Sequence, residues 1–202
     1  MITIVNYGMG NLGSVQNMFK RIGVEAIISN NIKEIENAKK LLLPGVGAFD
    51  AAMELINKSG LLPVLNYKAQ EEKIPVLGIC LGMQLLTNGS DEGVLSGLKW
   101  IDADTKKFEF ANNDMKVPHM GWNFIQPKNT SKLMNNLDSN SKFYFVHSYY
   151  VYCKSEQYVL ATTQYGNNFH SIIQNENIYG AQFHPEKSHK FGKQLLTNFS
   201  KI

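Results

Sequence analysis

Several features that define common classes of protein are scarce in this sequence of 202 residues. No apolar run approaches the roughly 20 residues that a membrane-spanning helix requires. Residues 1–7 carry neither the basic stretch nor the cleavage site of a signal peptide. The formal net charge is only +3 and basic residues are spread along the chain, which argues against nucleic-acid binding. We therefore expect a cytoplasmic protein that binds neither a membrane nor nucleic acid.

Cysteine is rare as well, since only Cys80 and Cys153 occur. Without an export signal, both thiols are expected to be reduced and not joined in a disulfide. Neither Cys-x-x-Cys nor His-x-x-x-His spacing occurs, so no metal site is expected. Gly8 and Gly10 lack the third glycine of a dinucleotide fingerprint and the Lys-Ser/Thr of a Walker loop. We interpret them as a tight turn and expect no cofactor.

Short apolar runs alternate with amphipathic segments in the first half of the chain. Strands are expected at 2–5, 24–28, 41–43 and 75–79, with helices at 11–22, 32–38, 48–59 and 61–72. This alternation predicts right-handed crossovers and a mostly parallel central sheet flanked by helices, with function at the carboxyl ends of its strands. In the C-terminal half an additional antiparallel β portion is expected, with short strands at 108–110, 116–117, 123–125, 143–146, 149–152, 158–160 and 171–173. No linker or repeat interrupts the chain, so 1–202 is expected to form a single α/β domain.

Residues 75–86 predict a strand, a sharp turn and a helix, with Gly-x-Cys-x-Gly at the turn. Glycine two residues before and two after Cys80 suits a strained nucleophile turn, because a Cβ at either position would clash. Cys80 would then be exposed at the tip of the turn, where the positive end of the helix favours a thiolate. The alternative is a buried cysteine at the end of a strand.

Two further segments are candidates for the surroundings of Cys80. Residues 44–47, Pro-Gly-Val-Gly, end a strand that is expected beside the one before Cys80. They form either a plain turn or a flexible loop that supplies a backbone N–H, from Val46 or Gly47, to an oxyanion site completed by the N–H of Leu81. Glu92 lies in the polar loop after the turn and can return to the mouth of the site.

The histidines differ in their surroundings. Residues 118–123, which include His119, are expected to form a packed loop, and direct catalysis is the alternative. His147 is expected to be a structural histidine with satisfied hydrogen bonds. His184 and Glu186 form the best candidate pair, because Pro185 fixes the backbone between them. The carboxylate can then hold an imidazole that faces the thiol, as nucleophilic catalysis requires.

Together these motifs resemble the class I glutamine amidotransferases over nearly the whole chain. More narrowly, they resemble the glutaminase subunits of imidazole glycerol phosphate synthase. Gly-x-Cys-x-Gly and His-Pro-Glu are typical of the whole class, whereas His-Met-Gly-Trp-Asn at 119–123 and Tyr-Phe-Val-His-Ser-Tyr at 144–149 are specific to that subunit. The resemblance implies that Cys80, His184 and Glu186 form a triad that hydrolyses glutamine to glutamate and ammonia.

The resemblance also implies further roles. The positions that match glutamine-binding residues of the family are Gln84, Glu92, Ser148 and Tyr149. Those that match the contact with a (β/α)8-barrel cyclase subunit, where ammonia leaves, are Met120, Trp122, Tyr144 and Lys187. In a heterodimer with that partner, the products would be imidazole glycerol phosphate and AICAR of histidine biosynthesis. Glutaminase activity without the partner is expected to be weak.

Three other functions are compatible with parts of the sequence. A close paralogue, which 87–93 and 98–103 resemble, would supply ammonia for the amidation of a surface-polysaccharide sugar. A cysteine peptidase or γ-glutamyl hydrolase would use the same Cys and His, although the loops expected to face a partner would then have no purpose. A non-catalytic interaction subunit would be expected to lack a member of the triad, but all three residues are present.

Overall fold

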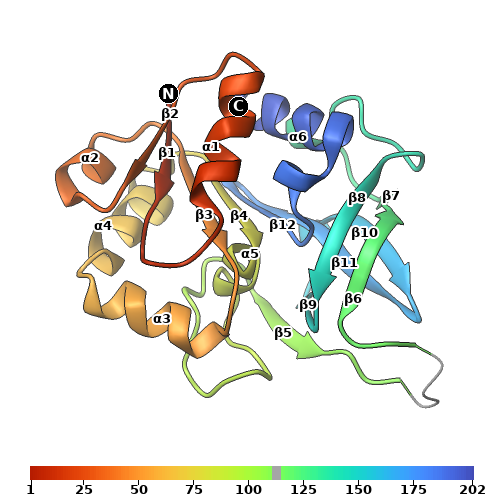
Figure 1. The fold of residues 1–202 in the computed structure, drawn as a ribbon. Helices are drawn as coiled ribbons and strands as arrows, with labels where there is room; N and C mark the ends of the chain where they lie inside the picture. The colour runs from red at the N-terminus through yellow and green to blue at the C-terminus, as the bar shows by residue number, and fades with distance from the viewer. Residues whose placement is uncertain (111–114) are drawn as a thin grey trace.

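The structure is a computed structural model that describes residues 1–110 and 115–202. In these residues a sheet of ten strands runs through both halves of the chain, and a separate two-stranded sheet lies beside it (Figure 1). The two-stranded sheet consists of β6 (His119–Phe124) and β8 (Lys142–His147). No helix in the described ranges is long and apolar enough to cross a membrane.

The N-terminal half supplies most of the parallel part of the sheet, as predicted. Neighbouring strands follow the order β2-β1-β3-β4-β12 and all pair in parallel. Their bounds are β1 (Ile2–Val5), β2 (Ala26–Ser29), β3 (Leu41–Gly45), β4 (Val76–Cys80) and β12 (Ile178–Ala181). The strand β3 is longer than expected, because Pro44 and Gly45 still pair with β4, and Gly45 lies opposite Cys80. The carboxyl ends of β3 and β4 therefore meet at Cys80.

The C-terminal half is mainly antiparallel, also as predicted. β12 pairs with β11 (Asn167–Asn175), which continues to β10 (Val159–Tyr165) and β7 (Gln126–Pro127). A branch from β11 leads through β9 (Tyr149–Cys153) to β5 (Ala103–Lys107). Several expected boundaries were wrong: residues 108–110 and 116–117 lie outside the strands, and β5 precedes them.

The segment expected as a packed loop at 118–123 is instead mostly strand β6. Pro118 and Gly121 obscure the strand pattern in the sequence, but β6 is stabilised by antiparallel pairing with β8 from His119 opposite His147 to Phe124 opposite Lys142. Its side chains alternate between the two faces, as in any strand. His119 is buried, whereas Met120, Trp122 and Phe124 are exposed.

Helices cover both faces of the parallel part. They are α1 (Leu12–Arg21), α2 (Ile32–Glu36), α3 (Phe49–Lys58), α4 (Leu62–Asn66), α5 (Leu81–Leu85) and α6 (His189–Lys201). The single helix expected at 61–72 is α4 followed directly by a π-helical segment, η1 (Tyr67–Glu71). Short 3-10 turns occur at η2 (Lys132–Met134), η3 (Glu156–Tyr158) and η4 (Pro185–Lys187).

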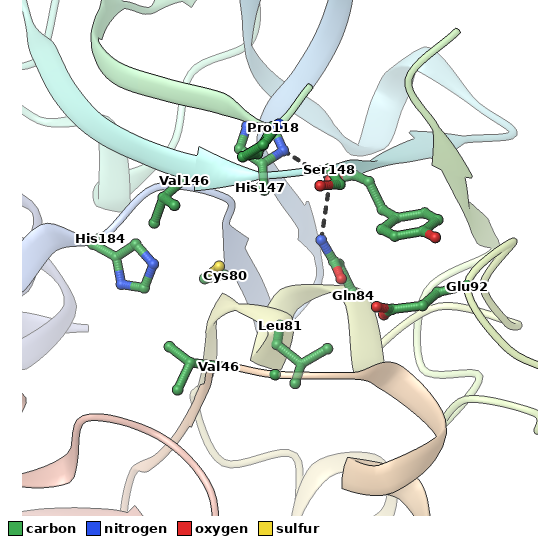
Figure 2. Close-up of a pocket in the computed structure, with 12 residues that line it drawn as sticks. Val46, Cys80, Leu81, Gln84, Glu92, Pro118, Val146, His147, Ser148 and His184 are labelled. Carbon is green, nitrogen blue, oxygen red and sulfur yellow. Dashed lines mark hydrogen bonds between the residues drawn. The ribbon is translucent and has the colours of Figure 1, made fainter. Parts of the chain in front are cut away.

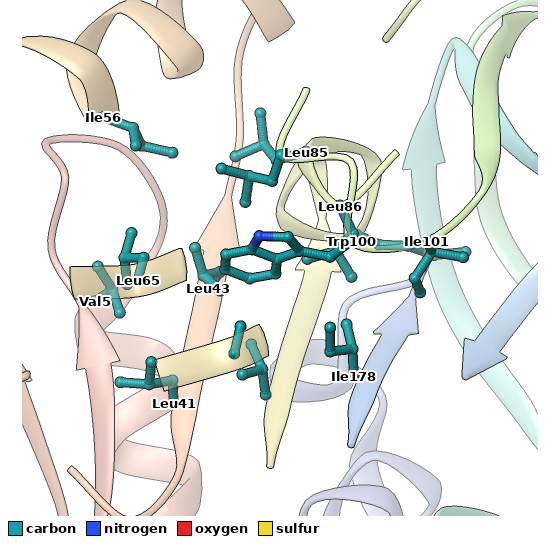
Figure 3. Close-up of a cluster of buried hydrophobic side chains, with 14 of the residues drawn as sticks. Val5, Leu41, Leu43, Ile56, Leu65, Leu85, Leu86, Trp100, Ile101 and Ile178 are labelled. Carbon is teal, nitrogen blue, oxygen red and sulfur yellow. The ribbon is translucent and has the colours of Figure 1, made fainter. Parts of the chain in front are cut away.

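The alternation of side chains in β3 divides the core into two clusters. Leu41 and Leu43 point to one side, where they pack with residues of α3 and α4, and Leu42 points to the other side, where α1 and α6 lie. Figure 3 shows part of the first cluster around Trp100, whose ring lies among leucine and isoleucine side chains. The Trp100 indole N–H donates to Asn66 Oδ1 at 2.8 Å, so this buried polar atom is satisfied. The sheet is thus fixed from both faces.

The turn at Cys80 depends on close backbone contacts that only glycine permits. A Cβ on Gly82 would lie 1.8 Å from the carbonyl oxygen of Leu43, and one on Gly78 would lie 2.5 Å from the carbonyl oxygen of Gly82. Both contacts are with backbone atoms, which cannot rotate away. The sequence interpretation that both flanking positions exclude a side chain is therefore confirmed.

We predict that Gly82→Ala lowers the free energy of unfolding by at least about 2 kcal/mol, because the methyl group forces β3 and α5 apart. Gly13→Ala is the matched control, since a Cβ at Gly13 meets nothing within 4 Å. Gly13 lies in α1, so that variant is expected to be as stable as the parent or up to about 1 kcal/mol more stable. Urea unfolding of the two variants measures the difference, and equal stability would contradict the steric account.

Candidate active site

A cavity of about 340 Å³ opens where β3 and β4 end. Nine of the residues singled out in the sequence line it: Val46, Gly47, Cys80, Leu81, Gln84, Glu92, Ser148, Tyr149 and His184. Pro118, Val146 and His147 complete the lining. Figure 2 shows these side chains arranged around Cys80, which lies between His184 on one side and Gln84 on the other. Residues separated by more than a hundred positions in the sequence therefore share one pocket.

Cys80 joins β4 to α5 in a strained conformation. Its φ angle is 54° and its ψ angle is −112°, a region that residues other than glycine rarely adopt. Such strain is typical of a nucleophile turn. The residue is only 6% exposed, so the expectation of an exposed tip was wrong. Residues 146–149, from the other half of the chain, line the same cavity as Cys80.

His184 is held between two partners. Its Nδ1 lies 2.8 Å from Glu186 Oε1 across η4, and its backbone N–H donates to the carbonyl oxygen of Tyr144 at 2.9 Å. The 3-10 turn begins at Pro185, which agrees with the expectation that this proline fixes the pair. Glu186 does not line the cavity but lies behind the imidazole, with its side chain 2% exposed.

The electrostatics of this pair depend on the thiol. Burial alone would lower the pKa of His184, but the interactions with Cys80 and with Glu186 outweigh burial and raise it to about 10. Nε2 of His184 and Oε2 of Glu186 are buried and have no hydrogen-bond partner among the described residues. Buried orphan atoms are rare in proteins and need an explanation. For Nε2 of His184 the explanation is its place in a ring that lines the cavity together with Cys80.

The second cysteine has different surroundings. Burial raises the pKa of the Cys153 thiol to about 12, and Glu156 and Asp102 add to this effect. Cys153 lies in β9 and is buried in the first core cluster. Its thiol is therefore protonated and inert at neutral pH, which leaves Cys80 as the cysteine that can react. Both are free thiols, as expected.

Backbone groups of two segments approach the thiol. Leu81 is the first residue of α5, where backbone N–H groups have no partner within the helix. Val46 and Gly47 follow the end of β3, and both line the cavity beside Leu81. Gly47 has a φ of 113°, a conformation that glycine adopts readily. The structure thus brings together the three residues singled out for an oxyanion site.

The far side of the cavity is polar. Gln84 Nε2 donates to the carbonyl oxygen of Tyr149 at 3.1 Å and to Gln182 Oε1 at 3.3 Å. Glu92 approaches from the loop after α5 and accepts from the backbone N–H of Phe49 at 2.9 Å. That contact lies at the start of α3, where the helix dipole favours a carboxylate. A ligand with an amide or amino group would find several oppositely polarised partners here.

Gln182 was not singled out in the sequence. It is fully buried, and its Nε2 donates to Cys80 Sγ at 3.9 Å. Its only signal is an amide side chain inside the otherwise apolar run 180–183. His147 was expected to be structural, and both of its ring nitrogens have partners, but it also lines the cavity.

Four residues singled out for contact with a partner lie outside the cavity lining. Tyr144 and Trp122 lie opposite each other in the β6–β8 sheet, with ring centroids 6.0 Å apart. The Lys187 ammonium group lies 5.7 Å from the centroid of the Tyr144 ring. Met120 is on the same face of β6 as Trp122 and is 61% exposed. These four residues form a surface next to the site.

The geometry can perform acyl transfer. A thiol beside an imidazole that a carboxylate orients is the arrangement that forms and hydrolyses thioesters. No group of three or more His, Cys, Asp or Glu side chains in the described ranges is placed to hold a metal ion. The fold and the site together define a class of protein that carries a cysteine at a strand–helix turn beside a histidine held by a carboxylate.

Comparison with known proteins identifies the family. The model of the family "Glutamine amidotransferase class-I" matches residues 3–202. A protein of Methanococcus maripaludis named imidazole glycerol phosphate synthase subunit HisH 2 is 55% identical, and the match covers 100% of this chain and 99% of the relative. A Pseudomonas aeruginosa protein of the same name is 48% identical, with 100% of both chains covered. The chain therefore belongs to the class I glutamine amidotransferase family, and within it to the group of the HisH subunits.

Solved structures support the fold. The structure of PurLQS from Thermotoga maritima superposes with a TM-score of 0.70, covering 98% of this chain and 96% of the other. The two sequences are only 17% identical, so this likeness concerns the fold alone. The enzyme class itself, a glutamine amidotransferase, follows from the family.

Two buried histidines, His147 in the cavity lining and His119 paired with it, should make stability sensitive to acid. Burial lowers the pKa of His119 to about 4 and that of His147 to about 3. In the unfolded chain both titrate near 6.5, so below that pH the unfolded state binds protons that the native state does not. Stability is therefore lost as pH falls from about 6.5 towards 4. Removing one of these histidines should reduce that loss.

We predict that the free energy of unfolding of the wild type falls between pH 6.5 and pH 4.5 more steeply than that of His119→Gln. The difference in slope is expected to reach up to about 1.4 kcal/mol per pH unit. Urea unfolding at several pH values measures both slopes. Parallel pH dependences of the two proteins would show that His119 is not buried in its neutral form.

Proposed function

We propose that the chain is a glutaminase that hydrolyses glutamine to glutamate and ammonia through Cys80, His184 and Glu186. The observation that carries this proposal is the shared cavity, in which a strained thiol, a carboxylate-held imidazole and an amide-binding wall meet. In the mechanism, His184 takes the proton of the Cys80 thiol, and the sulfur attacks the side-chain amide carbon of glutamine.

The tetrahedral intermediate carries its negative charge on the former carbonyl oxygen. Backbone N–H groups of Leu81 and of Val46 or Gly47 are proposed to hold that oxygen. The imidazolium of His184 returns the proton to the leaving nitrogen, and ammonia departs. Water then hydrolyses the γ-glutamyl thioester, with His184 acting again as the base, and the thiol is regenerated.

The opposite wall of the cavity is proposed to bind the substrate. Gln84, Glu92, Ser148 and Tyr149 all line the cavity, on the side away from His184 as Figure 2 shows for the first three. They would place the side-chain amide of glutamine against Cys80 and hold the amino acid end of the substrate. Positioning of this kind converts a bimolecular reaction into an effectively intramolecular one.

Ammonia is proposed to pass to a (β/α)8-barrel cyclase subunit in a heterodimer, which forms imidazole glycerol phosphate and AICAR in histidine biosynthesis. Two observations support this. The relatives at 48–55% identity carry the name imidazole glycerol phosphate synthase subunit, and the exposed Met120 and Trp122 form an apolar face next to the site. Exposed apolar patches of this kind mark protein contacts. A direct contact with the partner would deliver ammonia before water protonates it.

We predict that Cys80→Ala lowers glutamine-dependent product formation by the heterodimer at least about 10³-fold, because the nucleophile is lost. Added ammonium salts should still support the cyclase, since they bypass the cavity. Cys153→Ala is the matched control and should keep glutamine-dependent activity, because Cys153 lies in the core. The measurement is the steady-state rate with the cognate cyclase subunit, with glutamine or ammonium chloride as the nitrogen source.

Retained glutamine-dependent activity in Cys80→Ala would contradict the proposal. The acceptor pathway needs its own measurement, which is complementation of a histidine auxotroph that lacks the glutaminase subunit. Growth without histidine supports the synthase, whereas failure of an expressed, glutamine-hydrolysing protein to complement favours the surface-polysaccharide paralogue. Cleavage of peptides without release of ammonia from glutamine would favour a peptidase.

A further inference from the structure

A series of hydrogen bonds, separate from the contacts of the Cys80–His184–Glu186 group, reaches the cavity from the β6–β8 sheet. His147 Nδ1 lies 2.7 Å from the carbonyl oxygen of Tyr149. His147 Nε2 lies 3.0 Å from His119 Nδ1, and His119 Nε2 lies 3.3 Å from Asn123 Nδ2. Both histidines are buried. None of these side chains has a part in the proposed chemistry at Cys80.

The direction of every bond in this chain is fixed by its two ends. The Tyr149 carbonyl can only accept, so the proton of neutral His147 is on Nδ1 and its Nε2 accepts. His119 must then donate from Nδ1 and accept at Nε2, where Asn123 donates. The Asn123 amide is itself held, since its Oδ1 accepts from the backbone N–H of Phe124 at 2.8 Å and its Nδ2 also donates to the Gln164 carbonyl at 2.9 Å. Each histidine therefore has a single tautomer.

This series of hydrogen bonds ends on the carbonyl oxygen of Tyr149, which also binds a residue on the proposed substrate side of the cavity. Gln84 Nε2 donates to the same Tyr149 carbonyl at 3.1 Å, and the dashed lines in Figure 2 show both bonds meeting there. Gln84 donates further to Gln182, whose own amide reaches Cys80 Sγ. The Tyr149 carbonyl is therefore one of the two acceptors that hold the Gln84 amide.

The other end of this series of hydrogen bonds lies on β6, a strand with one inward and one exposed face. His119 and Asn123 point inward from β6, whereas Met120, Trp122 and Phe124 point outward and are exposed. The outward face is the one proposed to contact the partner. A displacement of β6 at its outward face would therefore also move His119 and Asn123, and through their hydrogen bonds His147 and the Tyr149 carbonyl in the pocket.

We propose that His119 and Asn123 are positioning residues for the glutamine pocket, which hold His147 in the tautomer that donates to the Tyr149 carbonyl and so orient Gln84. This inference rests on the proposed glutaminase function. It assigns to the inner face of β6 the task of setting the affinity for substrate, while the Cys80–His184–Glu186 group sets the reactivity of the thiol. The two tasks can be separated experimentally.

The variant Asn123→Asp tests the proposal with almost no change in size. A carboxylate cannot donate to His119 Nε2 but accepts from it, so the neutral form of His119, which burial favours, carries its proton on Nε2 and its Nδ1 becomes an acceptor. His147 then carries its proton on Nε2, and its bare Nδ1 faces the Tyr149 carbonyl without a hydrogen. The hydrogen bond that holds the pocket wall is lost, from a substitution that touches no cavity residue.

The probe is the diazomethyl ketone analogue of glutamine, which alkylates a cysteine only after it binds in the pocket. With the full chain, we expect Asn123→Asp to raise the half-saturation constant for inactivation about tenfold, the equivalent of one lost hydrogen bond. Alkylation of Cys80 by iodoacetamide, which needs no pocket, should stay within about twofold. The matched control is Asn168→Asp, which adds the same charge at an exposed position and should match the wild type in both reactions.

Nitrogen-15 NMR of the imidazole rings gives an independent signature, since it reports which nitrogen carries the proton. Both histidines are expected as Nδ1–H in the wild type, and as Nε2–H in Asn123→Asp. Equal half-saturation constants in Asn123→Asp and Asn168→Asp would overturn the inference, as would Nε2–H tautomers in the wild type. If the analogue fails to alkylate Cys80 selectively in the wild type, the proposed glutaminase function fails instead, so the two failures are distinguishable.

Discussion

The close approach of β3 to the turn after β4 places the Cys80 thiol beside the candidate oxyanion groups. The Leu43 carbonyl occupies the space that a side chain on residue 82 would need, and Gly45 pairs directly with Cys80. This contact forces the chain to reverse within one residue, which places Cys80 in its strained conformation. It also brings Val46 and Gly47 beside Leu81. Without it the thiol and the candidate oxyanion groups would not share one cavity.

Backbone strain and buried polar atoms without partners occur together at the cavity, and their free-energy cost is offset by the rest of the fold. A positive φ at a residue with a side chain costs of order 1–3 kcal/mol, and buried atoms without partners add to this. Both occur within the same group, at Cys80, His184 and Glu186. The two core clusters on either face of the sheet supply the compensating burial. Strain and orphan atoms at one place are what a catalytic site is expected to show.

Much of the fold was predictable because local sequence determines it. In β1 to β4, apolar runs end at glycine, proline or a helix start, so the parallel half followed from periodicity. The antiparallel half was harder, since Pro118 directly precedes β6, Gly121 lies within it, and its pairing with β8 joins residues from 18 (142 − 124) to 28 (147 − 119) positions apart. The same limit applies to the site. Gly-x-Cys-x-Gly and His-Pro-Glu are local signals, and they led to Cys80 and His184.

Features that depend on the packing of distant segments were not predictable. Cys80 was expected at an exposed tip but is only 6% exposed, and residues 146–149 from the other half of the chain line the cavity with it. Gln182 has no motif of its own and gains its interest only from lying 3.9 Å from the Cys80 sulfur. The pairing of His119 with His147 follows from the register of β6 and β8, which no local pattern specifies.

The central claim is that Cys80, His184 and Glu186 act as one electrostatic unit. Nitrogen-15 NMR titration of His184 in the wild type and in Cys80→Ala tests it most directly. The account predicts that His184 in the wild type keeps its proton until about pH 10, because the thiol and Glu186 outweigh burial. In Cys80→Ala the pKa of His184 should be clearly lower, while Cys153→Ala should leave it unchanged. Loss of the His184 proton at the same pH in the wild type and in Cys80→Ala would contradict the account.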